Sequence, residues 1–265
     1  MLEIKNLYKT FNPGSVNEKH ALNGINITVN DGDFITVIGG NGAGKSTMLN
    51  AVAGVWPVDE GSILIDGVDV TALPEYKRAK FLGRVFQDPM TGTAASMQIE
   101  ENLALAARRG KSRGLKWEVT KEEKEKFYEL LKSLDLGLED RLSAKVGLLS
   151  GGQRQAITLL MATIVKPKLL LLDEHTAALD PKTAAKVLEL TDKVIEENSL
   201  TALMVTHNMN DAIKHGNRLV MMNNGRIIYD VSGEEKKKLT VDDLLKKFSE
   251  ASGEAYADDR SMLAQ

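Results

Sequence analysis

Cysteine is absent from the 265-residue sequence, and aromatic residues make up only 5% of it. The lack of cysteine excludes disulfide bonds and thiolate metal sites, and it fits a reducing compartment. Long hydrophobic runs are missing too. The longest uncharged apolar-rich stretch, residues 156–165, is far shorter than the roughly 20 residues of a membrane helix. The first residues have no apolar signal-peptide core, so we expect a chain that is neither exported nor membrane-spanning and whose membrane role depends on a partner.

The charges are nearly balanced. Thirty-four basic and 37 acidic residues give a net charge of −3, which predicts no broad nucleic-acid-binding face. The length suits one large domain, or a domain with an inserted subdomain.

The first third of the chain reads as strands around one helix. Residues 2–7 and 25–29 alternate apolar and polar side chains, which indicates antiparallel edge strands. Residues 34–38 are continuously apolar, as in a strand buried on both faces, and they lead into a glycine-rich loop. A helix is predicted over 45–53, with Gly54 as its stop. The stretch 63–68 contains a turn signal at Asp66 and Gly67.

The pattern changes after a short strand predicted at 84–86. From 89 to 165 it is helical with no convincing buried strand, and the charged stretch 108–126 reads as a solvated loop and helix face. We interpret 89–165 as a helical subdomain inserted into an α/β core.

The last part returns to strands and helices. Strands are predicted at 168–172, 202–206, 219–222 and 226–231, the last two forming a hairpin, and a helix at 182–197. A capping-box-like start at 240–243 predicts one more helix. The fold class is therefore α/β, a mainly parallel sheet with an antiparallel β subdomain. The main domain spans 1–250, and the polar tail 251–265 is expected to be loosely ordered.

The glycine-rich loop matches a phosphate-binding pattern. Gly39, Gly44, Lys45 and Ser46 have the GxxxxGK[ST] spacing of a P-loop, between a predicted strand and a predicted helix. Glycines let backbone N–H groups converge on phosphate oxygens, Lys45 reaches the β- and γ-phosphates, and Ser46 binds Mg²⁺. The predicted ATP-binding residues of the loop are Gly39, Gly40, Asn41, Gly42, Ala43, Gly44, Lys45, Ser46 and Thr47.

Two acids follow the apolar strand at 168–172. Asp173 is placed to hold Mg²⁺, directly or through water, and Glu174 to polarise a water for attack on the γ-phosphate. Ser150, Gly151 and Gly152 open a predicted helix, where a serine hydroxyl and backbone amides can form a second anion-binding surface. For these three residues alone, a serine N-cap with a flexible turn is the favoured interpretation.

These motifs occur in a familiar order. GGNGAGKST, VFQDP, LSGGQ, LLLLDE, ALD and VTHN follow one another as in the nucleotide-binding subunits of ATP-binding-cassette transporters, which the sequence resembles over nearly its whole length. The resemblance implies a P-loop NTPase core that hydrolyses ATP with Mg²⁺.

The resemblance also implies further roles. Phe11 stacks on adenine, with Tyr8 a less favoured alternative. Gln87 contacts Mg²⁺ and the attacking water, Glu174 is the general base, and His207 hydrogen-bonds the γ-phosphate. The residues that would meet ATP on a second subunit are Ser150, Gly151, Gly152, Gln153 and Asp180. The working site therefore needs two cassettes, from a homodimer or with a paralogue.

Two positions depart from the family pattern. Gly40 stands where proline or serine is common, and we expect tolerance because only backbone geometry matters there. His175 stands where proline is frequent; a polar contact near the attacking water is one interpretation, and a neutral substitution at a surface position is favoured. His20 and His215 have no motif around them and are predicted to lie on the surface.

The implied function is energy coupling for a membrane transporter. Separate permease subunits would contact the groove around residues 89–97, at the cytoplasmic face of the membrane, and an extracytoplasmic substrate-binding protein is a further partner. A single cassette without spans resembles importers, and the segments around 87–95 and 173–181 resemble those of bacterial amino-acid systems, aromatic amino acids among them. The alternatives are a soluble cassette ATPase of translation or DNA repair, and a non-hydrolysing regulator, which Glu174, Gln87 and His207 disfavour.

Overall fold

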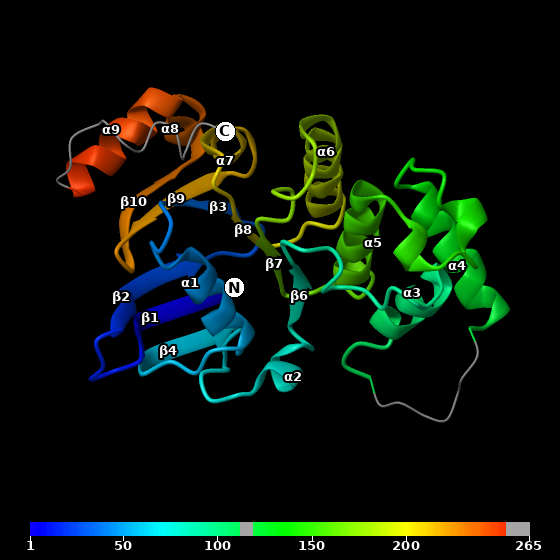
Figure 1. Ribbon diagram of the computed structural model, residues 1–265, viewed down its shortest axis with the longest axis horizontal. Coiled ribbons are helices and arrows are strands. Elements are labelled where there is room, and N and C mark those ends of the chain that lie inside the picture. Colours follow the sequence, from blue (N-terminus) through cyan, green and yellow to red (C-terminus); the bar gives the residue numbers. More distant parts are fainter. Residues whose placement is uncertain (112–118, 253–265) are drawn as a thin grey trace.

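The computed structural model describes residues 1–111 and 119–252, whose strands form two sheets (Figure 1). The smaller sheet has the order β2-β1-β4-β5 and is antiparallel throughout. Its strands are β1 (Leu2–Phe11), β2 (Lys19–Val29), β4 (Glu60–Ile65) and β5 (Val68–Asp69). β1 is hydrogen-bonded on both sides, so its prediction as an edge strand is wrong, whereas β2 does lie at the edge. The alternating apolar and polar side chains of β1 indicate that one face of the strand is solvated, and an inner antiparallel strand can also have one solvated face.

The larger sheet is mainly parallel. Its order is β10-β9-β3-β8-β7-β6, and β10 alone pairs antiparallel, through the hairpin predicted at Asn224 and Gly225. Its strands are β3 (Phe34–Ile38), β6 (Leu82–Val85), β7 (Leu169–Asp173), β8 (Ala202–Val205), β9 (Arg218–Asn223) and β10 (Arg226–Ser232). The α/β fold class expected from the sequence is confirmed.

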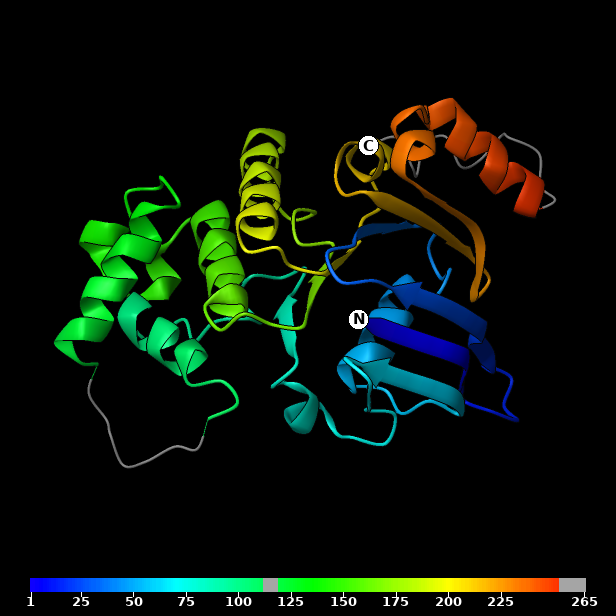
Figure 2. The same cartoon turned by 180° about the vertical axis from the view of Figure 1, so that it is seen from behind.

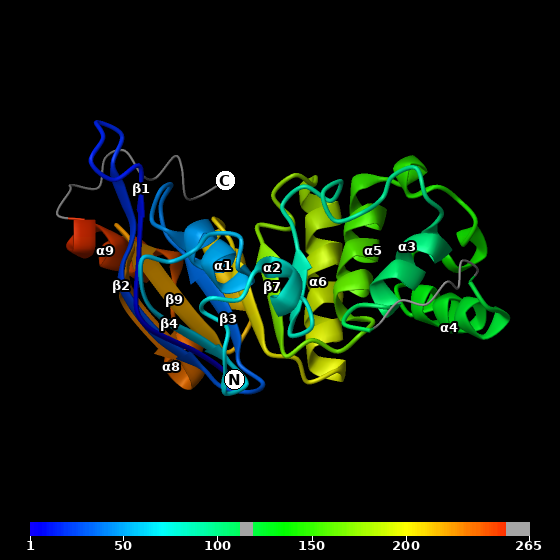
Figure 3. The ribbon, with the colours of Figure 1, turned by 90° about the horizontal axis from the view of Figure 1, so that it is seen from below.

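The apolar strands are covered on both faces. Leu169 and Leu171 of β7 belong to one core with residues of the small sheet, whereas Leu170 and Leu172 face a second core. Alternate side chains of a strand point to opposite faces, so a strand covered on both sides must be apolar at every position. Helix α1 (Lys45–Ala53), whose bounds agree with the sequence prediction, lies between the two sheets and shares the first core (Figure 3).

A group of helices lies between β6 and β7 in the chain. They are α3 (Ile99–Ala107), α4 (Lys121–Lys132) and α5 (Gly151–Thr163), with short 3-10 turns at Glu139–Arg141 and Val146–Leu148. Their core, around Phe127 and Leu131, is separate from those of the sheets. Part of the charged stretch 108–126 lies outside the described residues, as do residues 253–265 of the tail.

The remaining helices are α2 (Glu75–Arg78), α6 (Pro181–Glu197), α7 (Met209–Lys214), α8 (Gly233–Lys237) and α9 (Val241–Ser252). Of these, α2 contacts the end of α1 through Arg78, and the others pack against the large sheet. α6 packs beside α5, whereas α8 and α9 lie at the end of the molecule away from α3 and α4 (Figures 1 and 2). Across residues 1–111 and 119–252, no helix has both the length and the apolar character to cross a membrane.

A buried arginine terminates the helix that follows the P-loop. The guanidinium of Arg78 donates to the carbonyls of Ala51 and Val52, at 2.7 and 2.9 Å, and to those of Thr71 and Leu73, at 2.9 and 2.8 Å. The last carbonyls of a helix have no partner within it. Arg78 supplies that partner for α1 and ties α1 to the segment after β5.

We predict that Arg78→Met lowers the free energy of unfolding by about 3 kcal/mol, because buried carbonyls at the end of α1 lose their donors. Urea denaturation followed by circular dichroism measures the change. Lys77→Met, at the exposed neighbouring position, serves as the control and should stay within about 0.5 kcal/mol of wild type. Equal stability of the two variants would contradict this role of Arg78.

Candidate functional site

Close backbone approaches explain the glycines of the P-loop. Gly39 has φ 152°, and a Cβ there would lie 2.2 Å from the carbonyl oxygen of Met222. Gly44 has φ 102°, and a Cβ there would lie 2.5 Å from the carbonyl oxygen of Ala21. Both positions therefore require glycine. The loop is fixed between β9 and β2 before α1 begins at Lys45.

The ammonium of Lys45 lies under the loop. Only 6% of this residue is exposed, and Nζ donates to the carbonyls of Gly39 and Gly40 at 2.7 and 3.2 Å. Burial lowers the pKa of Lys45, while Glu174 and Asp173 act in the opposite sense. The side chain is thus a cation held at the base of the loop, where phosphate oxygens would lie.

A cavity of about 200 Å³ opens over the loop. Of the predicted ATP-binding residues it is lined by Phe11, Asn41, Gly42, Ala43, Gly44, Lys45, Ser46 and Thr47, together with Glu174. Gly39 and Gly40 do not line it. Lys19 and Ala21 of β2 also line the cavity, and sequence reasoning missed them, because only the pairing of β2 with β1 brings them there.

Phe11 is the last residue of β1. Its ring meets that of Trp56 edge-to-face, with centroids 5.5 Å apart. The structure thus places an aromatic pair beside the P-loop cavity, and the second member, Trp56, was not predicted.

The strand ends bring Glu174 and His207 together. Glu174 follows β7 with φ 43°, an uncommon backbone conformation for a residue with a side chain, and its N–H donates to Val205 at 3.0 Å. Its Oε2 lies 3.7 Å from Nδ1 of His207, which follows β8. This contact lowers the pKa of Glu174 and raises the pKa of His207. A carboxylate kept ionised beside the P-loop has the charge state that a general base requires.

Asp173 and Ser46 form an oxygen-rich pair beside Glu174. Ser46 Oγ lies 3.5 Å from Oδ1 of Asp173, and Nη2 of Arg84 lies 3.8 Å from Oδ2. Burial, as the main cause, raises the pKa of Asp173. A hydroxyl and a carboxylate are donors that Mg²⁺ prefers, so the pair fits that ion. Gln87 lies in the exposed turn after β6, and in the described parts of the chain no hydrogen bond joins it to the pair.

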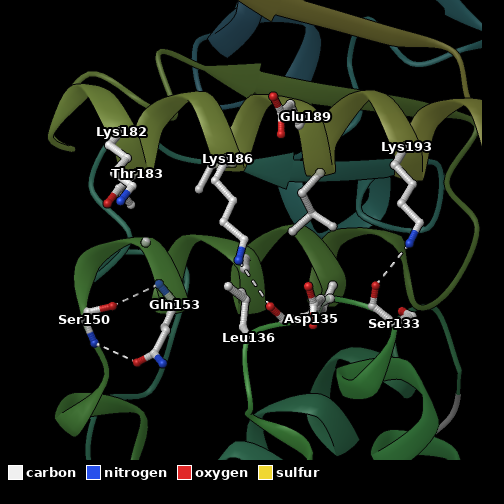
Figure 4. Close-up of a pocket in the computed structure, with 15 residues that line it drawn as sticks. Ser133, Asp135, Leu136, Ser150, Gln153, Lys182, Thr183, Lys186, Glu189 and Lys193 are labelled. Carbon is white, nitrogen blue, oxygen red and sulfur yellow. Dashed lines mark hydrogen bonds between the residues drawn. The ribbon is translucent and has the colours of Figure 1, made fainter.

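The residues predicted to act on a second subunit belong to a different cavity. Ser150 caps α5, where its Oγ accepts from the N–H of Gln153 and its own N–H donates to Oε1 of Gln153, both at 3.3 Å. Ser150, Gly152 and Gln153 line a groove of about 520 Å³ between α5 and α6 (Figure 4). Within one chain, this motif and the P-loop therefore do not share a site.

Helix α6 forms the other wall of that groove. Asp180 caps α6 by accepting from the N–H of Thr183 at 3.1 Å. Lys186 and Lys193 donate to the carbonyls of Asp135 and Ser133, each at 3.2 Å (Figure 4). These bonds attach α6 to the segment after α4. A Cβ on Gly152 would lie 2.2 Å from Cγ2 of Thr183, so the small residue permits the close approach of α5 and α6.

Two histidines predicted at the surface are buried. His175 is 2% exposed and His215 is 3% exposed. Nε2 of His175 lies 3.1 Å from Oγ1 of Thr191, and Nδ1 of His215 lies 2.7 Å from Oδ2 of Asp192. The surface assignments of His175 and His215 are therefore wrong, because α6 covers both positions with polar partners. His20 is exposed, as predicted.

Gly40 is not free of side-chain constraints either. A Cβ there would lie 3.3 Å from Cζ of Phe248 in α9. The expectation that only backbone geometry matters at this position is therefore incomplete, because the C-terminal helix packs directly against the loop.

Comparison with known proteins decides the family. The family model described as ABC transporter matches residues 22–177, from β2 to just beyond Glu174. The chain belongs to this family. The chain is therefore an ATP-binding subunit, which hydrolyses ATP to energise transport.

Relatives match over almost their full length. A tyrosine transport ATP-binding protein of Clostridioides difficile is 46% identical over 252 residues, 95% of this chain and all of the relative. A phosphonates import ATP-binding protein of Lactobacillus johnsonii is 32% identical over 265 residues, 97% of this chain and all of the relative.

A solved cassette shares the fold. The dimeric cassette MJ0796, in a post-hydrolysis state bound to ADP and Pi, has a TM-score of 0.74 and 31% identity, and the match covers 88% of this chain and 98% of that one. ABC subunits of this kind form dimeric cassettes in transporter complexes with membrane subunits.

The buried imidazole of His175 predicts a pH-dependent stability. Burial first, and His215 second, lower its pKa from 6.5 to about 4, against the opposing effect of Asp192. Between these two pH values the unfolded chain binds the proton and the native chain does not. The stability linked to this group is therefore complete above pH 6.5 and is lost as the pH falls towards 4, by about 3 kcal/mol.

The measurement is the free energy of unfolding at pH 7.5 and pH 4.5 for wild type and for His175→Gln. Glutamine keeps a donor for Thr191 but does not titrate. The wild type should lose about 3 kcal/mol more than the variant between the two pH values. Equal losses would show that His175 does not titrate in this way.

Proposed function

We propose that this subunit energises a bacterial-type importer of an amino acid with an aromatic side chain, tyrosine being the first substrate to test. The full-length relationship at 46% identity to a tyrosine transport ATP-binding protein carries this proposal. The amino-acid class also agrees with the segments around residues 87–95 and 173–181. The cassette does not itself touch the cargo, so the substrate is set by the membrane partner.

Residues at the strand ends have separate roles in ATP hydrolysis. Lys45 and the N–H groups of the loop bind the phosphates. Glu174 accepts the proton of the attacking water, and His207, 3.7 Å from it, hydrogen-bonds the γ-phosphate. Ser46, Asp173 and, after movement of its exposed turn, Gln87 would hold Mg²⁺. When bound, that ion neutralises charge on the β- and γ-phosphates.

The second half of the site comes from another cassette. Ser150, Gly151, Gly152, Gln153 and Asp180 would face ATP held by the partner's P-loop, in a homodimer or with a paralogue. The two separate cavities of one chain support this arrangement. ATP binding would close the dimer and hydrolysis would reopen it.

The inserted helices 89–165 would pass this motion to permease subunits at the cytoplasmic face of the membrane, through the segment 89–97. In an importer, an extracytoplasmic substrate-binding protein would deliver the cargo. The net charge of −3 supports the expectation that no nucleic acid takes part.

Glu174→Gln should reduce steady-state ATP hydrolysis by at least about a hundredfold, because the general base is removed. The same variant should accumulate an ATP-bound dimer, visible by size-exclusion chromatography. Glu196→Gln, exposed on α6, is the control and should hydrolyse ATP like wild type. Turnover near the wild-type rate in Glu174→Gln would disprove the base assignment.

Deletion of the subunit from its own cells should abolish uptake of radiolabelled tyrosine at micromolar concentration, and wild type, but not Glu174→Gln, should restore it. If tyrosine uptake is unchanged but uptake of another compound is lost, tyrosine is not the substrate, whereas the transporter function still holds. Co-purification with ribosomes or DNA, and not with a membrane protein, would instead favour a soluble ATPase of translation or DNA repair.

A further inference from the structure

Two consecutive residues of α6 each hold a buried histidine. Thr191 contacts His175, which directly follows Glu174, and Asp192 contacts His215, which follows α7. Thr191 and the two histidines are buried, whereas the side chain of Asp192 is 33% exposed. The site assignments above give a role to none of the four. Their position behind the pair of Glu174 and His207 raises the question of what this polar cluster does.

The hydrogen bonds at Thr191 fix the state of the imidazole. Oγ1 of Thr191 donates its single proton to the carbonyl of Val187, at 2.8 Å. Towards His175 this hydroxyl can then only accept, so Nε2 of His175 carries the proton and donates across 3.1 Å. The contact is therefore a directed hydrogen bond with one donor and one acceptor. It joins the residue after Glu174 to the middle of a helix of 17 residues.

The second contact anchors the other side of the pair. His207 is followed by Asn208, which caps α7 by accepting from the N–H groups of Asn210 and Asp211. α7 leads directly to His215, whose Nδ1 donates to Asp192 at 2.7 Å. The buried ammonium of Lys236 donates to the carbonyls of His215 and Gly216. α6 is thereby joined to the segment that begins at His207.

Glu174 requires such support. Its φ of 43° is a conformation that surrounding contacts must hold in place. Its N–H donates to Val205, which fixes the backbone on the β8 side. The next residue, His175, supplies a fixed point on the α6 side. The carbonyl of Glu174 also accepts from the N–H of Ala177 at 3.0 Å. These contacts together keep the carboxylate beside His207, and loss of the contact at His175 lets it move.

We propose that His175 is a positioning residue for ATP hydrolysis: its hydrogen bond to Thr191 holds the Glu174 carboxylate in the orientation that activates water. The inference rests on the proposed role of Glu174 as the general base. His175 acts through Glu174 and does not itself touch the nucleotide. A displacement of about 1 Å of a reacting group costs on the order of a hundredfold in rate. Loss of the hydrogen bond should therefore lower kcat.

The test compares His175→Leu, His175→Gln and Thr191→Val in the full-length subunit. His175→Leu and Thr191→Val remove the bond and should lower kcat at least about tenfold, with KM for ATP within about twofold of wild type. His175→Gln keeps an N–H donor and should retain most of the activity. The double variant His175→Leu with Thr191→Val should lose no more than the worse single variant, because both remove the same bond.

The matched control is Thr163→Val. Oγ1 of Thr163 makes the same bond to the carbonyl four residues earlier, Leu159, at 2.8 Å in α5, and touches no histidine. Its kcat should equal that of wild type. In the Glu174→Gln background, Thr191→Val should leave the ATP-bound dimer unchanged, because the bond acts on the base and not on nucleotide binding.

The results separate this inference from the proposed function. If Glu174→Gln is inactive but His175→Leu and Thr191→Val keep full kcat, the positioning role is refuted and the base remains. If the variants lose activity only as KM rises, or if His175→Gln falls as far as His175→Leu, the cluster is merely structural. If Glu174→Gln stays active, the base assignment itself has failed.

Discussion

The parallel pairing of β3, β8 and β7 determines where the chemistry of this protein can occur. Val37 pairs with Val205, and Asp173 pairs with the same residue from the other side. The three strands therefore end at one level, and the residues that follow them must meet. The P-loop follows β3, Glu174 follows β7 and His207 follows β8. The sheet register alone brings the P-loop, a carboxylate and an imidazole together at one edge of the sheet.

Local patterns in the sequence predict some features of this structure and not others. The P-loop and the bounds of α1 follow from local rules, since glycines and a buried strand specify them. The burial of His175 and His215 depends on packing against α6, whose contacting residues lie 16 and 23 positions away in the chain. No local pattern reports which polar side chain will cover a histidine. Gly40 was misjudged in the same way, because Phe248 approaches it from the far end of the sequence. Local signals predicted the elements, and tertiary contacts decided the surroundings of single residues.

Helix α6 contacts three parts of the molecule. Its first turn, from Asp180 to Thr183, meets Gly152 of the helix that carries the second anion-binding motif. Its middle holds the histidines behind the strand ends, and Lys186 and Lys193 attach it to the segment after α4. One helix thus contacts Gly152 of α5, the segment after α4 and the two buried histidines.

The charges at the strand ends restrict what can bind there. Asp173 and Glu174 are adjacent carboxylates, and Lys45 and Arg84 are the cations that face them. Burial works against each of these charges, because it raises the pKa of Asp173 and lowers that of Lys45. A nucleotide would add several negative charges beside two carboxylates, which two buried cations cannot balance in a region of low dielectric constant. The oxygen donors of Ser46 and Asp173 would suit a divalent cation that enters with the nucleotide, and charge balance would then favour the metal complex over the free triphosphate.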